Sequence, residues 1–384
     1  MADRRPHVLI VGVSTRAFAT SAALAGYRVT AVDAFGDADL RAVADVIALR
    51  RDGVPYDPEA AVAAAHTVAA DLVAYTSNLE NHPAAVAALA RGRRLLGNAP
   101  PVLRRVRNPI TLMRGFRARG LATPATRASA PGVGLDGRRW LLKPRQSGGG
   151  HGTLPWRRGL RVSRRAYVQE RIAGVPGSIV FAADGRRAVP LGVSRQLIGE
   201  RAFGGRGFRY CGSLLASSGA PLFERQTELY ERATALAQAA TAAFGLRGVN
   251  GLDFIARAGV PLPIELNPRY SASMELVERA TGLSIFGVHV DACDGQLPGA
   301  ARPAARVFGK AIVFARRAVV AVDLAGFGAA AVADVPHPGE RIGRGHAICT
   351  VLADAADGGR CTRALAHAAA GIYGAVELRA RGAA

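Results

Sequence analysis

Residues 1–100 alternate short apolar runs with alanine-rich segments, and this alternation constrains the fold more than any other feature of the sequence. An apolar run at 7–13 (HVLIVGV) is followed by a helical pattern at 15–25 and a second apolar run at 27–33. Strands that alternate with helices in this way pair in parallel, with the helices on the faces of the sheet. Residues 1–100 are therefore predicted to form a small doubly wound α/β domain.

The first loop of this domain, residues 12–16 (GVSTR), follows the first predicted strand. It lacks the second and third glycines of a dinucleotide-binding fingerprint, which let the backbone approach a pyrophosphate. A nicotinamide site with Asp33 on a ribose is accordingly disfavoured. A tight turn is the favoured interpretation.

The pattern changes beyond an arginine-rich linker at about 101–130. Strand-like segments then recur between glycine-rich loops, with one long helix at about 224–244, which is typical of α+β rather than doubly wound structure. We predict three parts: 1–100, 101–300 with a hinge near 166–174, and a small β-rich C-terminal capping domain at 301–384. The strand-like segments are 139–143, 166–169, 178–182, 188–193, 249–255 and 263–266, followed in the last part by 311–314 and 348–352 and a closing helix at 362–372.

The charge of the chain is strongly positive, with 50 Lys+Arg against 29 Asp+Glu and a formal net charge of +21. Lysine occurs only at Lys143 and Lys310, so almost all of this charge is arginine, and it is spread along the chain. Nucleic-acid binders usually concentrate arginine and interleave aromatic residues, which are only 6% here. Nucleic acid is therefore not expected to be the physiological partner. The 49% of hydrophobic residues is enough to build sizeable cores.

Nothing in the sequence predicts a membrane or disulfide-rich protein. The four cysteines are irregularly spaced and form no C-x-x-C motif, so neither a zinc ribbon nor a disulfide framework is indicated. The apolar run after Arg4 and Arg5 is too short for a signal peptide, and the alanine-rich stretch at 60–75 is too short and too polar to span a bilayer. We expect a cytoplasmic protein without a membrane partner, and the oligomeric state stays open.

Lys143 ends a predicted strand and is followed by the glycine-rich segment 148–152 (GGGHG). Consecutive glycines expose backbone N–H groups to phosphate oxygens, and a lysine beside them adds a point charge for the same anion. A flexible hairpin is the alternative for such a loop. Lysine in a chain that otherwise uses arginine favours phosphate binding, because a compact ammonium differs from a planar fork. No Gly-Lys-Ser/Thr follows the glycines, so this is not a Walker loop.

A second cluster combines Asp253 with Glu265 and Asn267. Glu265 and Asn267 are two residues apart on an extended segment, so their side chains share a face, and Asp253 can join them from an adjacent antiparallel strand. Two carboxylates and an amide oxygen suit Mg²⁺, with Mn²⁺ as an alternative. A hairpin with solvated polar faces is the competing interpretation.

Residues 120–300 resemble the ATP-grasp superfamily of carboxylate–amine ligases, with 265–269 (ELNPR) matching its E-x-N-P-R stretch. The resemblance implies a Rossmann-like domain at 1–100, a two-lobed ATP-grasp domain, and ATP and Mg²⁺ as cofactors. It also implies that Glu265 and Asn267 ligate the metal with help from Asp253. Arg269 would stabilise the transferring phosphoryl group or a substrate carboxylate. The phosphates of ATP would meet Lys143 and a closing loop that contains Gly148, Gly149, Gly150 and Gly152.

Residues 167–174 (YVQERIAG) resemble the adenine-binding hinge of that superfamily, which implies nucleotide contacts at Gln169, Glu170 and Ile172. Gln169 replaces a common Glu, although an amide oxygen can still accept from the adenine amino group. Pro176 stands where many members have the acid that holds the ribose. A linker lysine is absent, with Arg104, Arg105 and Arg107 nearby as substitutes. Arg195 is a further candidate for catalysis or for binding a substrate or phosphate, against an equally weighted structural role.

The whole chain is also similar to the tyramine–glutamate ligase group of methanofuran-type cofactor synthesis, through 192–196 (GVSRQ), 174–178 (GVPGS) and 334–336 (DVP). The resemblance implies an ADP-forming ligase that joins a small carboxylate, such as glutamate, to a small amine through an acyl phosphate. Two alternatives stay open. One is activation of bicarbonate in the manner of biotin carboxylase, and the other is a non-catalytic binder of polyanions or nucleic acid.

Overall fold

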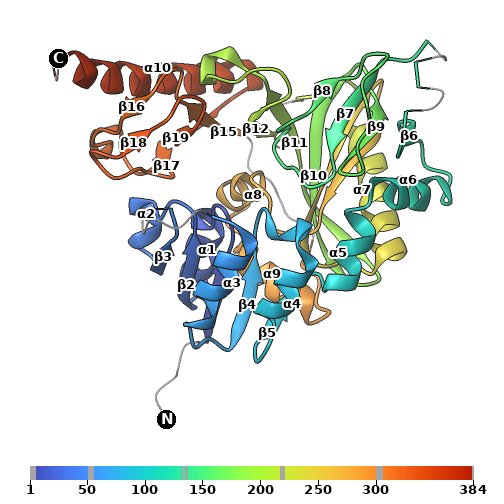
Figure 1. The fold of residues 1–384 in the computed structure, drawn as a ribbon, viewed down its shortest axis with the longest axis horizontal. Helices are drawn as coiled ribbons and strands as arrows, with labels where there is room; N and C mark the ends of the chain where they lie inside the picture. Colours follow the sequence, from blue (N-terminus) through green and yellow to red (C-terminus); the bar gives the residue numbers. More distant parts are fainter. Residues whose placement is uncertain are drawn as a thin grey trace.

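The computed structural model describes residues 6–50, 56–130, 133–134, 137–216, 221–299 and 306–382. Within these ranges the chain forms a five-stranded, an eight-stranded and a four-stranded sheet, together with a two-stranded pair of β16 (Val319–Val320) and β18 (Arg341–Ile342). Figure 1 shows the N-terminal sheet in blue, the four-stranded sheet in green at the upper right and the C-terminal part in red. The mixed α/β class predicted from the sequence is confirmed.

The N-terminal sheet is parallel with strand order β3-β2-β1-β4-β5, as the alternating pattern predicts. Its first strand is buried along its whole length because helices cover both faces. The helix that follows the first strand shares one face with a helix from much later in the chain. The elements are β1 (His7–Val11), α1 (Arg16–Leu24), β2 (Arg28–Asp33), α2 (Ala38–Arg41), β3 (Asp45–Ala48), α3 (Pro58–His66), β4 (Leu72–Tyr75), η1 (Leu79–Asn81), α4 (Pro83–Leu89) and β5 (Arg94–Leu96), with α9 (Ile285–Cys293) as the later helix.

Asp33 is the last residue of β2, and its carboxylate is hydrogen-bonded to the loops that follow β1 and β2. Its carboxylate accepts hydrogen bonds from the backbone N–H and hydroxyl of Thr15 and from the backbone N–H groups of Phe35 and Gly36. The side chain is 1% exposed. These four bonds agree with the tight turn favoured by the sequence and leave no carboxylate oxygen directed at a ribose.

The eight-stranded sheet has the order β14-β13-β10-β11-β12-β15-β19-β17, and all its pairs are antiparallel. One long helix, α7, packs against one face, whereas α8 and α9 lie against the other. Its elements are β10 (Val175–Asp184), β11 (Ala188–Ile198), η2 (Arg201–Phe203), β12 (Tyr210–Ala216), α7 (Gln226–Phe244), β13 (Arg247–Arg257), β14 (Val260–Asn267), α8 (Met274–Thr281), β15 (Val307–Phe314), β17 (Val332–Ala333) and β19 (Ala347–Ala355).

The four-stranded sheet, in the order β6-β9-β7-β8, forms the small lobe. It has a small core of its own around Val133, Trp140 and Val168. Two helices lead into it from the N-terminal domain. The elements are α5 (Pro100–Val106), α6 (Pro109–Arg117), β6 (Thr126–Arg127), β7 (Trp140–Pro144), β8 (Leu154–Pro155) and β9 (Ala166–Glu170).

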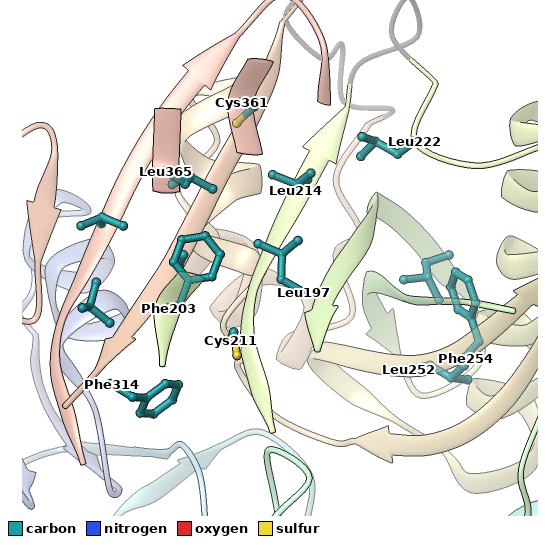
Figure 2. Close-up of a cluster of buried hydrophobic side chains, with 14 of the residues drawn as sticks. Leu197, Phe203, Cys211, Leu214, Leu222, Leu252, Phe254, Phe314, Cys361 and Leu365 are labelled. Carbon is teal, nitrogen blue, oxygen red and sulfur yellow. The ribbon is translucent and has the colours of Figure 1, made fainter. Parts of the chain in front are cut away.

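The C-terminal part shares its core with the large sheet. Strands β15 and β19 extend that sheet, and α10 (Gly358–Gly382) packs across them. Figure 2 shows Cys361 and Leu365 of this helix beside Leu214 of β12, within one cluster of buried side chains. The predicted segments 311–314, 348–352 and 362–372 lie inside β15, β19 and α10. The part foreseen as a β-rich cap thus also contributes a 25-residue helix and three strands of the main sheet, β15, β19 and β17.

The four cysteines are not paired with one another in the structure. Cys211, Cys293, Cys349 and Cys361 are all free, and burial raises the pKa of each thiol. In the ranges that the structure covers, none of the helices has the length and apolar character needed to cross a membrane.

Candidate nucleotide and metal site

The two carboxylates predicted to bind a metal face each other across the β13–β14 pair. Asp253 is the register partner of Glu265, and Asn267 lies two residues farther on the same face. The Asn267 Nδ2 donates to Asp253 Oδ2 at 3.1 Å, and the Gln196 Nε2 donates to Asp253 Oδ1 at 3.0 Å. The structure therefore brings together all three predicted metal ligands.

The electrostatics of this cluster favour a bound cation. Burial and the neighbouring charge of Glu265 raise the pKa of Asp253 to about 6. A divalent ion would relieve that repulsion, and two carboxylates with an amide oxygen are a donor set that Mg²⁺ accepts. The described residues contain no group of three or more His, Cys, Asp or Glu that could hold a metal. The fit consequently rests on these two carboxylates and the Asn267 amide.

Lys143 projects from β7 toward the carboxylates. Its Nζ donates to Gln169 Oε1 at 3.1 Å and lies 5.6 Å from the centre of the Tyr167 ring. Although burial opposes its charge, Tyr167 and the nearby carboxylates of Glu265 and Asp253 raise the pKa of Lys143. Lys143 is thus a fully charged ammonium placed between the small lobe and the metal cluster.

Gln169 differs from the expectation for an adenine contact. It is 1% exposed, and its amide oxygen, which was expected to accept from adenine, instead accepts from Lys143. Its Nε2 points to Thr126 Oγ1 and the Ile264 carbonyl, each at 3.4 Å. Gln169 therefore links the lysine to both lobes, and an adenine contact would require this arrangement to change.

The glycine loop lies against the start of β12. The Tyr210 N–H donates to the Gly149 carbonyl at 3.0 Å, and a Cβ on Gly150 would meet the Phe208 carbonyl oxygen at 1.8 Å. Gly150 also has a φ of +76°, which favours glycine. Gly148 and Gly152 lie on either side with exposed backbones. Glycine is required here for close approach of the backbone as well as for exposed N–H groups.

The hinge residue Glu170 turns its side chain away from Lys143. It pairs with Trp140 in the β7–β9 ladder, whereas Lys143 pairs with Tyr167, so the two side chains leave opposite faces. The Glu170 carboxylate accepts from the Ala125 N–H at 3.0 Å and lies 3.5 Å from Arg138 Nε. Only the backbone of Glu170 can face the nucleotide, and the half-buried Ile172 follows it at the hinge.

Arg195 does not join the cluster, so the suggestion that it is a catalytic ligand needs correction. Ser194 of β11 pairs with Ser178, which in turn pairs with Asp253, so these three residues share one face of the sheet. Arg195, the next residue, therefore projects from the opposite face, where it is exposed. Strand alternation separates Arg195 from Gln196, which does contact Asp253.

Arg107 is the linker arginine that reaches the site. Its guanidinium donates to Glu265 Oε1 at 2.7 Å, to the Leu266 carbonyl at 3.0 Å and to the Ser147 carbonyl at 3.1 Å. It also donates to Asn81 Oδ1 at 2.8 Å. Arg107 thereby joins the metal strand, the glycine loop and the N-terminal domain. The sequence predicts Arg104, Arg105 and Arg107 as equal candidates, and only the fold distinguishes Arg107 from the other two.

Glu80, in η1 of the N-terminal domain, was not found from the sequence. Arg269 Nη2 donates to its Oε1 at 2.8 Å and lies 3.3 Å from Asn267 Oδ1. Although burial opposes its charge, Arg269 and Arg107 lower the pKa of Glu80. Its other oxygen and Arg269 Nε have no hydrogen-bond partner among the described residues. This buried pair thus keeps polar atoms without a partner in the described part of the chain. A lone Glu after an Asn-Leu turn carries no recognisable motif, so the sequence does not indicate Glu80.

Asn98 links the end of β14, the strand that carries Glu265 and Asn267, to the N-terminal domain. Its Nδ2 donates to Asn250 Oδ1 at 2.8 Å and to the Pro268 carbonyl at 3.1 Å, while the Tyr75 hydroxyl donates to the same carbonyl at 3.1 Å. Its Oδ1 accepts from the Arg247 N–H at 2.9 Å. The strand that carries Glu265 and Asn267 is thereby fixed against the edge of the parallel sheet.

Comparison with known proteins agrees with this geometry. Residues 106–273 match the family described as the ATP-grasp domain, whereas none of the curated proteins matches the sequence. Among solved structures, pyruvate carboxylase from Rhizobium etli superposes with a TM-score of 0.74 at 15% identity; 94% of this chain is covered, but the chain spans only 37% of that enzyme.

Two similar structures match over nearly their full length. The L-amino acid ligase from Bacillus licheniformis has a TM-score of 0.69 at 17% identity, with 96% of this chain and 98% of that chain covered. An ADP complex of N5-carboxyaminoimidazole ribonucleotide synthetase has a TM-score of 0.69 at 16% identity, with 97% and 98% covered. At these identities the likeness establishes the fold. The chain therefore contains an ATP-grasp domain, at residues 106–273.

Proposed function

We propose that this protein is an ADP-forming ligase that joins a small carboxylate to a small amine through an acyl phosphate. The observation that carries the proposal is the convergence of Asp253, Glu265 and Asn267 with the half-buried cation Lys143 inside an ATP-grasp domain. Phosphoryl transfer depends mainly on positioning and on neutralising charge, and this arrangement supplies both.

In the first half-reaction, a carboxylate oxygen of the substrate attacks the γ-phosphorus of ATP and the bond to the β–γ bridging oxygen breaks, which releases ADP. Lys143 and the N–H groups of the glycine loop would hold the phosphates in line. A Mg²⁺ ion on Asp253, Glu265 and Asn267 would neutralise charge on those phosphates. Arg107 fixes the position of Glu265 relative to Ser147, the residue before the glycine loop, through its hydrogen bonds to both.

In the second half-reaction, the amine nitrogen attacks the acyl carbon, inorganic phosphate leaves and the nitrogen loses a proton. Arg269 lies beside the metal cluster and is oriented by Glu80, so it can bind the oxygens of the acyl phosphate. The carboxylate of Glu80 is held beside Arg269, and its negative charge can attract an ammonium group. Closure of the glycine loop would exclude water, which would otherwise hydrolyse the intermediate.

For the substrates, we propose an amino acid such as glutamate as the carboxylate and an aryl-alkyl amine such as tyramine as the acceptor. This assignment rests on the resemblance of three short segments to the tyramine–glutamate ligase group. Activation of bicarbonate remains the second candidate, because pyruvate carboxylase is among the similar structures. Both reactions release ADP, so the acceptor distinguishes them.

The decisive experiment is nucleotide product analysis with Mg-ATP and a panel of carboxylates crossed with amines, including glutamate with tyramine. We expect ADP and phosphate to form only when both substrates are present. ADP formation with bicarbonate alone would favour the second candidate. AMP formation would indicate adenylation and would contradict the acyl-phosphate mechanism.

A further inference from the structure

The only two tryptophans of the chain lie side by side in the small lobe, and each is flanked by a pair of arginines. Trp140 begins β7 and follows Arg138 and Arg139, whereas Trp156 comes just after β8 and precedes residues 157–158, both arginine. The Trp156 N–H donates to the Trp140 carbonyl at 2.8 Å. Antiparallel pairing thus converts two mirrored sequences, RRW and WRR, into one cluster.

These residues surround a cavity of about 400 Å³. Its lining includes both tryptophans, the arginines at 138, 139, 157 and 158, and Arg171 from the hinge. A volume of this size is at the lower end of the range for small-molecule sites. The cavity therefore fits a compact ligand rather than a long polymer.

The cavity lies at the end of the β7–β9 pair where Trp140 pairs with Glu170. In the β7–β9 ladder Trp140 pairs with Glu170, whereas Leu141 pairs with Gln169 and Lys143 with Tyr167. Side chains of neighbouring residues leave opposite faces of a strand. The face that carries Trp140 is consequently the reverse of the face that carries Lys143. Arg139 and Arg171 are each one residue along from the Trp140–Glu170 pair, so the same alternation directs them to the Lys143 face, and the cavity wraps the end of the β7–β9 pair.

The charge around the cavity is largely uncompensated. Arg138 lies 3.5 Å from the Glu170 carboxylate. No ion pair joins Arg139, Arg157, Arg158 or Arg171 to an acidic group in the part of the chain that the structure describes, and the guanidinium of Arg171 instead lies over the Phe208 ring. An anion with several oxygens can bind such guanidinium groups at two points.

The indole of Trp156 is held in place before any ligand binds. Its Nε1 donates to the Leu160 carbonyl at 3.3 Å, and Gly134 packs closely against its six-membered ring, where a Cβ would lie 3.1 Å away. Gly134 has a φ of +80°, which also favours glycine. The ring is half-buried, so part of its surface remains available to a flat group.

We propose that this cavity binds a small anion that carries a flat ring, of the nucleoside monophosphate class. The ring would pack on Trp156, and the phosphate would lie between the two arginine pairs. Binding at this position would contact the end of β7 and β9, the strands that carry Lys143 and Gln169. The inference does not depend on which ligase reaction the protein performs.

Tryptophan fluorescence tests this directly, because both tryptophans line the cavity. At constant ionic strength, guanosine monophosphate serves as the probe, with guanosine and inorganic phosphate as its two halves. We expect a saturable change of emission whose half-saturation concentration is at least about tenfold lower for the nucleotide than for either half. No saturable change, or equal responses to nucleotide and phosphate, would overturn the proposal.

Two variants with the same change of charge locate the binding. Arg157→Ser/Arg158→Ser removes one arginine pair of the cavity, whereas Arg164→Ser/Arg165→Ser removes an exposed pair of the same lobe outside it. We expect the first to weaken binding at least about tenfold and the second to leave it within twofold. Equal losses would show attraction to bulk charge only, as would binding of a single-stranded oligonucleotide in place of the mononucleotide.

A third variant, Lys143→Ala, separates the cavity from the nucleotide site. The emission change with guanosine monophosphate should persist in this variant with an unchanged half-saturation concentration. Its disappearance would place the ligand beside Lys143 and would contradict the proposal, without affecting the proposed ligase reaction.

Discussion

Within the described residues, two clusters of largely buried charge can be compared, and their central carboxylates lie in opposite electrostatic environments. The site cluster is the group around Asp253 that we propose to bind the nucleotide and metal. The junction cluster lies where the N-terminal domain, α8 and the C-terminal strands meet. The site cluster contains Lys143, Arg107, Arg269, Asp253, Glu265 and Glu80, and the junction cluster contains Arg16, Lys310, Glu275, Asp334 and Asp39.

In the junction cluster, the central carboxylate is saturated. Glu275 accepts from Arg16 with one oxygen and from Lys310 with the other. Although burial opposes its charge, Lys310 and Arg16 hold the pKa of Glu275 far below its ordinary value. Arg16 also donates to Asp334 at 2.9 Å, and Thr350 donates to the same carboxylate. This cluster therefore ties three regions of the chain together.

In the site cluster, by contrast, the central carboxylate is kept in an unfavourable environment. Burial and Glu265 raise the pKa of Asp253, and a buried oxygen of Glu80 lacks a partner among the described residues. The two clusters contain the same residue types, so composition does not separate them. The difference lies in the central carboxylates, because Glu275 has a cation on each oxygen whereas Asp253 faces a second carboxylate. The rim of the junction cluster is less complete, since Arg16 Nη2 has no hydrogen-bond partner among the described residues and burial raises the pKa of Asp39.

Removing the charge of Glu275 should have the largest effect. We expect Glu275→Gln to lower the free energy of unfolding by about 3–5 kcal/mol, because it leaves two buried cations without their shared partner. Denaturant unfolding measures this change. The double variant Glu275→Gln/Lys310→Met should recover part of the loss, since it removes one of those cations. A loss under about 1 kcal/mol in the single variant would show that the junction cluster is not structural.

Removing the charge of Asp253 should instead lower turnover strongly and change the free energy of unfolding little. We expect Asp253→Asn to lower turnover roughly 100-fold or more, because a divalent ion that stabilises transition-state charge contributes several kcal/mol. Without nucleotide, its free energy of unfolding should stay within about 1 kcal/mol of the wild type or rise, because repulsion from Glu265 is lost. Steady-state kinetics and denaturant unfolding of one preparation test both parts. A large loss of stability with intact turnover would reverse the assignment of the two clusters.

The part of the site cluster that the sequence predicts is the part built from local geometry. Asp253, Glu265 and Asn267 lie on two consecutive strands, so period-two alternation and one hairpin are enough to place them together. Lys143 was visible because lysine is rare in this chain. Predictions that needed only local geometry agree with the structure, as do the alternating strands and helices of the N-terminal sheet.

The remaining residues depend on contacts between distant segments. Glu80 and Arg269 are 189 positions apart, and Arg16 and Glu275 are 259 apart, so no local pattern announces either pair. The prediction for Arg195 disagrees with the structure for a different reason. It stands next to Gln196 in an appealing motif, but one residue of shift along a strand reverses the face. Long-range pairing and strand register were therefore the two things that the sequence alone could not supply.

His289 lies outside both clusters and should make the stability of the fold depend on pH. Burial lowers the pKa of His289 to about 4, and its Nδ1 accepts from the Val249 N–H at 3.0 Å, so the folded state holds it neutral. As the pH falls below about 6.5, the unfolded chain binds a proton that the folded chain does not. Stability present above that pH should then be lost, by about 2 kcal/mol at pH 5.

The matched variant for this effect is His289→Gln, which keeps an acceptor for Val249 and cannot titrate. Denaturant unfolding at pH 7.5 and at pH 5 gives the difference for each protein. The wild type should lose about 2 kcal/mol more than the variant over this interval. Equal losses would mean that other groups account for the acid sensitivity. Glu275 of the junction cluster should stay ionised between pH 7.5 and pH 5, so the difference between the two proteins should not come from that cluster.

Arg195→Ala should have the smallest effect, and its smallness tests the assignment of faces. Arg195 is exposed on the side of the sheet opposite Asp253, so we expect turnover and the KM for ATP to change less than about twofold. Gln196→Ala, one residue along, removes a 3.0 Å hydrogen bond to Asp253 and should raise the KM for Mg-ATP severalfold. Steady-state kinetics on the two variants compares adjacent residues of β11 whose side chains leave opposite faces of the sheet. If Arg195→Ala were the more damaging of the two, strand alternation would not govern which residues of β11 reach the nucleotide, and the site cluster would have to extend through the sheet.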